Sequence, residues 1–350
     1  MASETQSQSR IEALNERARQ ANLRGAWDRR AARAEDDVRP WVWRWKDILP
    51  CLLEAGELVP IDDRMRMRTI GFQNPSSKVT LSTTPTVTVT MQHLGPGEIT
   101  ESHRHTRTSL YFFIQGEDTA TVEEGELQTM APGDLLIQPS WTWHGTTNKG
   151  KEPAIWLTIQ DTGLINTFDA EFRGSYSGGG VQPAAKSEGY YRDRLGLFQT
   201  SAALETEGAS FPIKYPWQDT LATLEALADA EESDAFDGVV ADYQNPATSG
   251  PATLTMGARI QMLRPGEETQ SHRHTGNGIY HVVRGSGTVS VGKVQDGEET
   301  LEWGEHDTFF VPPWRWHHFR NDSATEPLIL FSVNDHPLLH ATKLYREEQA

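Results

Sequence analysis

The chain has 350 residues, 37% hydrophobic and 23% charged, which is enough apolar material for two ordinary globular domains or one large one. Its net charge of −17 repels phosphates, which argues against nucleic acid and anionic membrane surfaces as partners. The single cysteine cannot form an intrachain disulfide, and the N-terminus has no apolar signal segment. We therefore expect a soluble cytoplasmic protein without a membrane-spanning segment.

The first part of the chain has a helical pattern. Residues 9–37 are rich in Arg, Ala, Glu and Leu, which predicts an amphipathic helical arm with many exposed charges. A shorter helical pattern follows at Asp47–Gly56. We assign residues 1–77 to this arm and its lead-in.

From about Lys78 the sequence changes to period-two alternation rich in Val and Thr, with Gly and Pro at intervals of eight to twelve residues. This texture is typical of an all-β sandwich or barrel, and it predicts a first domain over residues 78–175. It returns in a second domain over 251–350. The intervening residues 176–250 contain Ser177–Gly180 and an acidic helical pattern at Gln218–Asp234, which predict a linker.

An internal repeat relates the two β domains. Pro96–Thr106 and Pro265–Thr275 agree at nine of eleven positions, with an offset of 169 residues. Pro139–His144 and Pro312–His317 share a proline, two tryptophans and a histidine, with an offset of 173. The chain therefore contains two tandem copies of one β module.

Each copy carries three histidines with the spacing of metal ligands. In the first copy His103 and His105 are two residues apart, so on a strand both imidazoles project from one face. His144 is expected on an adjacent strand facing the same interior. Three imidazoles on one side of an ion leave positions open for water, oxygen or substrate. The alternative is that they are neutral core histidines.

These spacings resemble the two motifs of the cupin superfamily of small jelly-roll β-barrels. Many cupins add a glutamate ligand that is separated from the second histidine by three or four residues, where this chain has Ser109 and Leu110. A site with three neutral histidines keeps the full charge of a divalent metal, which favours a chelating phenolic substrate. The ligands suit Fe(II), although Zn, Cu, Ni and Mn also accept them.

The second copy is less regular than the first. Its candidate ligands are His272, His274 and His317, with Gly278 and Ile279 at the glutamate position. His306 replaces the glycine that opens the second motif. The residues leave open whether this is a second metal site or a barrel that is only structural.

Beyond the motifs, the chain from about residue 38 to its end resembles gentisate 1,2-dioxygenase and the related salicylate and 1-hydroxy-2-naphthoate dioxygenases. The resembling segments are Leu52–Pro60, Ser102–Thr106, Pro139–His144, Asn245–Pro251, Tyr280–Val283, Phe331–Asp335 and Leu344–Glu348. The resemblance implies a homotetramer with Fe(II) on His103, His105 and His144. It also implies that O₂ opens an aromatic ring between the carbons that bear a hydroxyl and a carboxyl group.

Of four candidate substrate residues, three depart from the family pattern. Tyr111 stands where gentisate-type enzymes usually have a carboxylate-binding arginine, and Thr146 where they often have a histidine. Thr158 replaces an aspartate, and Gln92 is retained. An unpaired buried carboxylate would cost a few kcal/mol, so either Arg104, Arg107 or Arg173 supplies the charge or the substrate is not a plain hydroxybenzoate.

The sequence thus predicts an all-β protein of two cupin barrels, and a non-haem Fe(II) ring-cleaving dioxygenase that uses a small aromatic substrate and O₂. Two alternatives stay open: an iron dioxygenase for a different phenolic or non-carboxylate substrate, and a bicupin that binds a metal or ligand without turnover.

Overall fold

The computed structural model describes residues 2–20, 38–61, 67–76, 83–195, 211–292 and 297–350. It divides into two compact units, Met1–Val38 and Arg39–Ala350. The first unit contains α1 (Ala2–Gln20). The predicted helix over 9–37 therefore begins earlier than expected, and its part beyond Gln20 lies outside the described residues. Among the described helices, none is long and apolar enough to cross a membrane.

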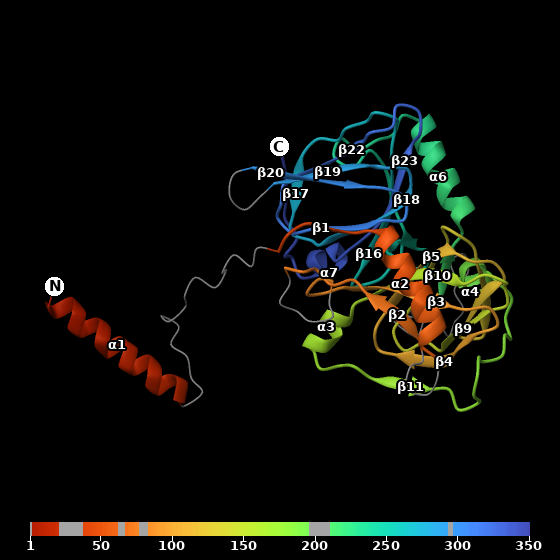
Figure 1. Cartoon of the computed structure of the whole chain (residues 1–350), viewed down its shortest axis with the longest axis horizontal. Coiled ribbons are helices and arrows are strands. Elements are labelled where there is room, and N and C mark those ends of the chain that lie inside the picture. The colour runs from red at the N-terminus through yellow and green to blue at the C-terminus, as the bar shows by residue number, and fades with distance from the viewer. Residues whose placement is uncertain (1, 21–37, 62–66, 77–82, 196–210, 293–296) are drawn as a thin grey trace. The chain divides into compact units, whose positions relative to one another are not determined.

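The second unit consists of two β-barrels, each made of two facing antiparallel sheets (Figure 1). In the first barrel a six-stranded sheet has the order β12 (Ile213–Tyr215), β8 (Leu135–Gln138), β5 (Ser109–Gln115), β10 (Ala154–Gln160), β3 (Thr88–Leu94) and β2 (Arg68–Gly71). The five-stranded sheet has the order β11 (Arg173–Ser175), β4 (Ile99–His105), β9 (His144–Asn148), β6 (Thr119–Glu123) and β7 (Glu126–Met130).

The second barrel repeats this plan. Its six-stranded sheet has the order β1 (Trp41–Trp43), β21 (Thr308–Val311), β18 (Gly278–Arg284), β23 (Leu328–Asn334), β16 (Gly257–Leu263) and β13 (Val239–Asp242). Its five-stranded sheet has the order β20 (Glu298–Trp303), β19 (Gly287–Gly292), β22 (His317–Asn321), β17 (His272–His274) and β24 (Glu347–Gln349). The predicted all-β bicupin fold is confirmed.

Segments expected outside the barrels complete their sheets. The expected arm supplies β2 to the first barrel and β1 to the second, and the expected linker supplies β12 to the first and β13 to the second. The predicted domains, 78–175 and 251–350, therefore leave out strands that belong to the barrel sheets. An edge strand can come from a distant part of the chain, because pairing with the sheet satisfies its backbone hydrogen-bonding groups. The start of the first predicted domain lies outside the described residues.

The other described elements of this unit are helices and a small hairpin. The two longer helices, α2 (Trp45–Leu58) and α6 (Trp217–Asp229), match the helical patterns expected near Asp47–Gly56 and Gln218–Asp234. Each buries a narrow stripe, Ile48 and Leu52 in α2 and Thr220 and Leu224 in α6. The shorter elements are α3 (Thr162–Thr167), α4 (Tyr190–Leu195), α7 (His336–Ala341), β14 (Gln244–Asn245) and β15 (Gly250–Pro251).

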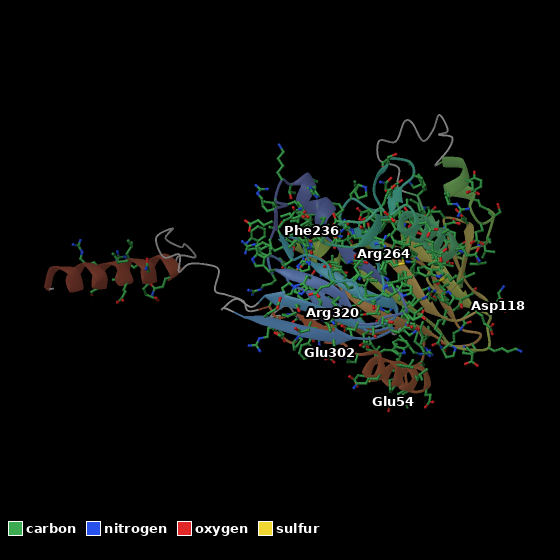
Figure 2. The ribbon with its side chains drawn as sticks, turned by 90° about the horizontal axis from the view of Figure 1, so that it is seen from above. Glu54, Asp118, Phe236, Arg264, Glu302 and Arg320 are labelled. Atoms are coloured by element: carbon green, nitrogen blue, oxygen red, sulfur yellow. The ribbon has the colours of Figure 1, made fainter. Side chains whose placement is uncertain are left out.

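Each barrel has a largely apolar interior, and the six-stranded sheets also bury their outer faces, which carry Phe112 and Phe331. The first interior includes Leu94, Phe113, Leu136 and Trp156, and the second is rich in valine, leucine and phenylalanine. On the outer face of the second barrel's five-stranded sheet lie the exposed Glu302 and Arg320, whose strands both pair with β19 at Thr288 (Figure 2). The five-stranded sheet thus has the hydrophobic-in, polar-out pattern of an antiparallel sheet with one face toward solvent.

The barrels contact each other through reciprocal interactions. The Thr86 hydroxyl donates to Asp335 at 2.7 Å, and the Thr255 hydroxyl donates to Asp161 at 2.8 Å, each crossing to the other barrel. Between them Phe112 stacks on Phe331 with ring centroids 4.2 Å apart. The two copies of the sequence repeat therefore meet as equivalent halves, and Asp161 serves this contact.

One turn shows where the copies diverge. Gly133 adopts a φ of +89°, in the left-handed region that favours glycine, and an added Cβ there would lie 2.4 Å from the Trp217 ring. In the second barrel His306 holds the equivalent turn at a φ of +67°. Its ring lies 5.2 Å from that of Trp45, so the bulky residue gains a packing partner in this strained conformation.

The buried His281 makes the fold sensitive to acid. Burial lowers its pKa to about 3, and its Nδ1 lies 3.0 Å from the Thr308 hydroxyl. Below pH 6.5 His281 is protonated in the unfolded chain, whereas in the folded chain it stays neutral until about pH 3. The free energy of unfolding therefore falls by about 1.4 kcal/mol per pH unit from this group as the pH drops through that window.

We expect His281→Asn to lose less stability between pH 7.5 and 5.5 than the wild type, by about 1.4 kcal/mol. Urea unfolding of chelator-treated protein at the two pH values measures the difference, and the other histidines contribute equally to both proteins. An equal loss in the two proteins would show that His281 is not the depressed group.

Candidate metal centre and substrate site

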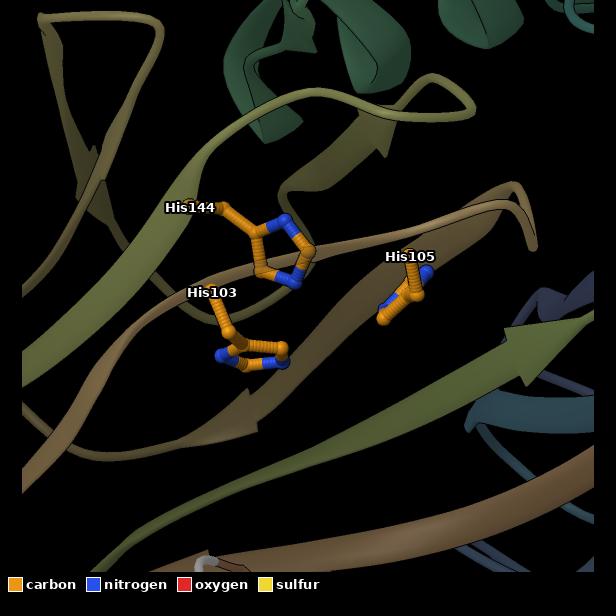
Figure 3. Close-up of side chains that lie close together, drawn as sticks. All are labelled: His103, His105 and His144. Atoms are coloured by element: carbon orange, nitrogen blue, oxygen red, sulfur yellow. The ribbon is translucent and has the colours of Figure 1, made fainter. Parts of the chain in front are cut away.

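Three histidines of the first barrel converge on one point. His103 and His105 come from β4 and His144 begins β9, and the pairing register places His103 directly opposite His144. All three are buried, and one ring nitrogen of each lies within 4.8 Å of the others (Figure 3). Ring centroids are 4.4 Å apart for His103 and His144, 4.9 Å for His105 and His144, and 5.6 Å for His103 and His105.

Backbone carbonyls fix the orientation of each ring. The Nδ1 atoms of His103, His105 and His144 lie 2.8, 2.8 and 3.0 Å from the carbonyl oxygens of Glu101, Arg107 and Thr142. These contacts put the proton on Nδ1 and leave Nε2 to bind an ion, as is common where a backbone carbonyl orients a metal-binding histidine.

Burial favours the neutral form of His105 and His144. Burial, followed by the charge of Arg107, lowers the pKa of His105 to about 3, and burial lowers that of His144 well below its usual value. The buried Nε2 of His144 has no hydrogen-bond partner. A neutral, oriented and unpartnered imidazole nitrogen fits a divalent transition metal, so the donor set suits the predicted ion.

The four other interior candidates share the space that the triad faces. Gln92 on β3, Tyr111 on β5 and Thr158 on β10 lie on one face of the six-stranded sheet. Thr158 pairs with Tyr111 on one side and with Thr90 on the other, and Gln92 shares the face of Thr90 because it is two residues further along the strand. The Thr158 hydroxyl donates to Gln92 Oε1 at 3.4 Å. Thr146 follows His144 by two residues on β9 and is also buried. The structure therefore brings together residues that the sequence placed far apart.

Glu123 is an interior residue that the sequence analysis did not single out. It pairs with His144 in the β6–β9 register, and the Thr142 hydroxyl donates to its Oε1 at 3.1 Å. Burial raises its pKa well above the usual value. Because the Thr142 carbonyl also holds His144, Glu123 positions the loop that orients the third ligand. The alternation of Thr119–Glu123 was the signal that could have revealed it.

The three arginines considered for carboxylate binding lie in different places. The Arg104 guanidinium stacks on Trp141 and Trp143, 4.3 and 4.6 Å from their ring centroids, on the strand face opposite His103 and His105. Arg173 pairs with His105 across β11 and β4, so both side chains project from one face. Its charge lowers the pKa of both His105 and His144.

Arg107 is tethered near the same triad. Its guanidinium donates to Gln160 Oε1 at 3.2 Å and lies 3.2 Å from Glu171 Oε1. Arg107 and Arg173 thus put positive charge beside the triad, and Arg104 does not.

The described residues contain a second buried triad, His272, His274 and His317, in which one ring nitrogen of each histidine also lies within 4.8 Å of the others. Residues 90–160 and 259–334 each match the Cupin domain family. Two tandem cupin barrels with converging histidines define the bicupin class.

Comparison with known proteins narrows this class. The chain is 33% identical over 349 residues to a 5-aminosalicylate 1,2-dioxygenase from a Comamonas species, covering 97% of this chain and 91% of that protein. It is 35% identical to a 1-hydroxy-2-naphthoate 1,2-dioxygenase from Nocardioides sp. (strain KP7), covering 97% and 87%. The salicylate 1,2-dioxygenase of Pseudoaminobacter salicylatoxidans, solved with gentisate, has a TM-score of 0.86 at 26% identity, covering 97% of this chain and 94% of that one. The chain belongs to the gentisate-type family of bicupin ring-cleaving dioxygenases.

Proposed function

We propose that the first barrel is the active site and that it opens the ring of a hydroxylated aromatic carboxylate with Fe(II) and O₂. The observation that carries this proposal is the buried triad of His103, His105 and His144, whose rings converge in the barrel interior beside two arginines. The relatives named for 5-aminosalicylate and 1-hydroxy-2-naphthoate support a substrate that carries adjacent hydroxyl and carboxyl groups.

The histidines would hold the ion, and Fe(II) would supply a path for electrons from the chelated phenol to O₂. Arg173 and Arg107 orient the substrate carboxylate through charge-assisted hydrogen bonds. Gln92 and Tyr111 offer polar contacts to the ring substituents, and Thr146 and Thr158 line the same interior. The apolar wall, which includes Trp156 and Phe113, excludes water from the reacting ring.

The two alternatives have less support. Arg107 and Arg173 supply the positive charge of the family arginine that Tyr111 replaces, so the site is compatible with a carboxylated substrate. A bicupin without turnover is not favoured, because the near full-length relatives are named as dioxygenases.

The test is anaerobic reconstitution with Fe(II), followed by O₂ uptake with gentisate, salicylate, 5-aminosalicylate, 1-hydroxy-2-naphthoate, an aminophenol and hydroquinone. We expect stoichiometric uptake and loss of aromatic absorbance with one or more of the carboxylates. Uptake confined to the aminophenol or hydroquinone would favour the non-carboxylate alternative. No uptake across the panel by iron-loaded protein would contradict ring cleavage of these substrates.

Tyr111 allows a separate prediction. Burial raises its pKa far above the usual value, so the hydroxyl keeps its proton and can donate a neutral hydrogen bond. We expect Tyr111→Phe to raise KM for the carboxylated substrate about 5-fold, the equivalent of about 1 kcal/mol, with little change in kcat. Steady-state O₂ uptake measures both constants. An unchanged KM would remove Tyr111 from substrate binding.

Assembly and location complete the proposal. The homotetramer and the cytoplasmic location stay predictions, the first from the family resemblance and the second from the composition. Analytical ultracentrifugation of the iron-loaded protein tests the assembly.

A further inference from the structure

The histidine rings of the second triad have nearly the same spacing as those of the first. His272 and His274 come from β17, and His317 begins β22 directly opposite His272. Ring centroids are 4.4 Å apart for His272 and His317, 5.2 Å for His274 and His317, and 5.6 Å for His272 and His274. No pair differs by more than about 0.3 Å from its counterpart in the first barrel. A barrel kept only for its packing has no need to hold three imidazoles in this arrangement.

Backbone carbonyls orient two of these three rings. The Nδ1 atoms of His274 and His317 lie 3.2 and 2.9 Å from the carbonyl oxygens of Gly276 and Arg315. The remaining nitrogen of His317, Nε2, is buried without a hydrogen-bond partner. Buried polar atoms of this kind normally have a partner. His317 is only 1% exposed, so its unpartnered nitrogen points to a bound ion as the partner.

A cavity of about 160 Å³ adjoins the second triad, and its charge differs from that of the first site. Its lining includes Asp234, Asp237, Arg259, Tyr345 and Glu347. The single arginine among these five is already paired, with Asp237 at 2.6 Å and with Asp242, a further carboxylate, at 2.8 Å. The cavity wall is therefore acidic overall.

The strand that borders each triad accounts for this difference. In the first barrel β11 pairs with β4 and places Arg173 opposite His105. In the second barrel the C-terminal strand β24 pairs with β17 in the same way and places Glu347 opposite His274. A carboxylate thus occupies the position of the arginine, which favours a cation and opposes an anionic aromatic acid.

We propose that the second barrel binds a divalent transition-metal ion through His272, His274 and His317 and that this ion stabilises the fold without taking part in ring cleavage. The ion joins β17 to β22 and so consolidates the sheet on which the C-terminal strand pairs. Binding to the folded chain alone raises its stability by mass action. The proposal is independent of the substrate assigned to the first barrel.

The test uses Co(II) as the probe on full-length protein freed of metal with a chelator. We expect two equivalents per wild-type chain and one in His144→Ala, as well as one in His317→Ala. His144→Ala leaves the second triad intact, so it should still melt at a higher temperature with Co(II) than without it, while showing no O₂ uptake after Fe(II) loading. In the double variant His144→Ala/His317→Ala, Co(II) should no longer raise Tm.

Two results would overturn the proposal: one equivalent in the wild type, or no Co(II) in a folded His144→Ala. His317→Gln is a milder second variant should His317→Ala fail to fold, and circular dichroism verifies the fold of each. If His144→Ala binds one equivalent but wild-type protein never consumes O₂, the second site stands and the function proposed for the first fails.

Discussion

Replacing His105 with alanine is expected to abolish iron binding in the first barrel and to lower turnover on the order of 10³-fold or more. His105 is 3% exposed, and the Arg107 carbonyl holds its Nδ1, so Nε2 is the ring nitrogen that can bind an ion in the barrel interior. Without it, two imidazoles remain, and water or substrate would have to complete the coordination. Metal analysis by mass spectrometry and O₂ uptake are the two measurements.

His281→Asn is the matched control, because His281 is also a buried histidine but lies outside both triads. We expect it to retain metal and turnover near pH 7.5. If the second triad binds iron as well, total metal in His105→Ala should fall to half rather than to zero. Full activity in His105→Ala would refute the assignment of the first barrel as the active site.

The repeat and the triads could be predicted from the sequence because their signals are local. His103 and His105 share a strand face by alternation alone, and a duplicated motif reveals a duplicated module without any tertiary information. The convergence of His144 with them needed only an adjacent strand. The triad and the bicupin fold were therefore available before the structure.

The charge environment was not available, because it depends on which strand lies beside β4. Arg173 lies 68 positions beyond His105, and no periodicity shows that β11 returns to pair with the ligand strand. The same holds for β24 and Glu347 in the second barrel. The strands β1, β2, β12 and β13 were not predicted, and their residues were assigned to the arm and the linker, because short edge strands carry little sequence pattern of their own.

Arg173 yields the second large effect. We expect Arg173→Gln to lower kcat/KM for a carboxylated substrate by about 10- to 100-fold, mostly through KM, since a hydrogen bond to a charged group contributes about 1.5–3 kcal/mol. Arg173 projects from the same face as His105, beside the position that the substrate carboxylate would take. Kinetics with a carboxylated and a non-carboxylated phenol separate carboxylate binding from a general loss of activity.

Arg104→Gln is the matched control for this experiment, because Arg104 lies one residue from both histidine ligands on the same strand. Its guanidinium lies over Trp141 and Trp143 on the opposite face, so its loss should alter stability more than KM. Arg173→Lys should recover part of the affinity, since a lysine keeps the charge but not the bidentate geometry. If Arg173→Gln and Arg104→Gln have the same KM, the carboxylate is bound elsewhere, and Arg107, tethered to Glu171 and Gln160, becomes the residue to test.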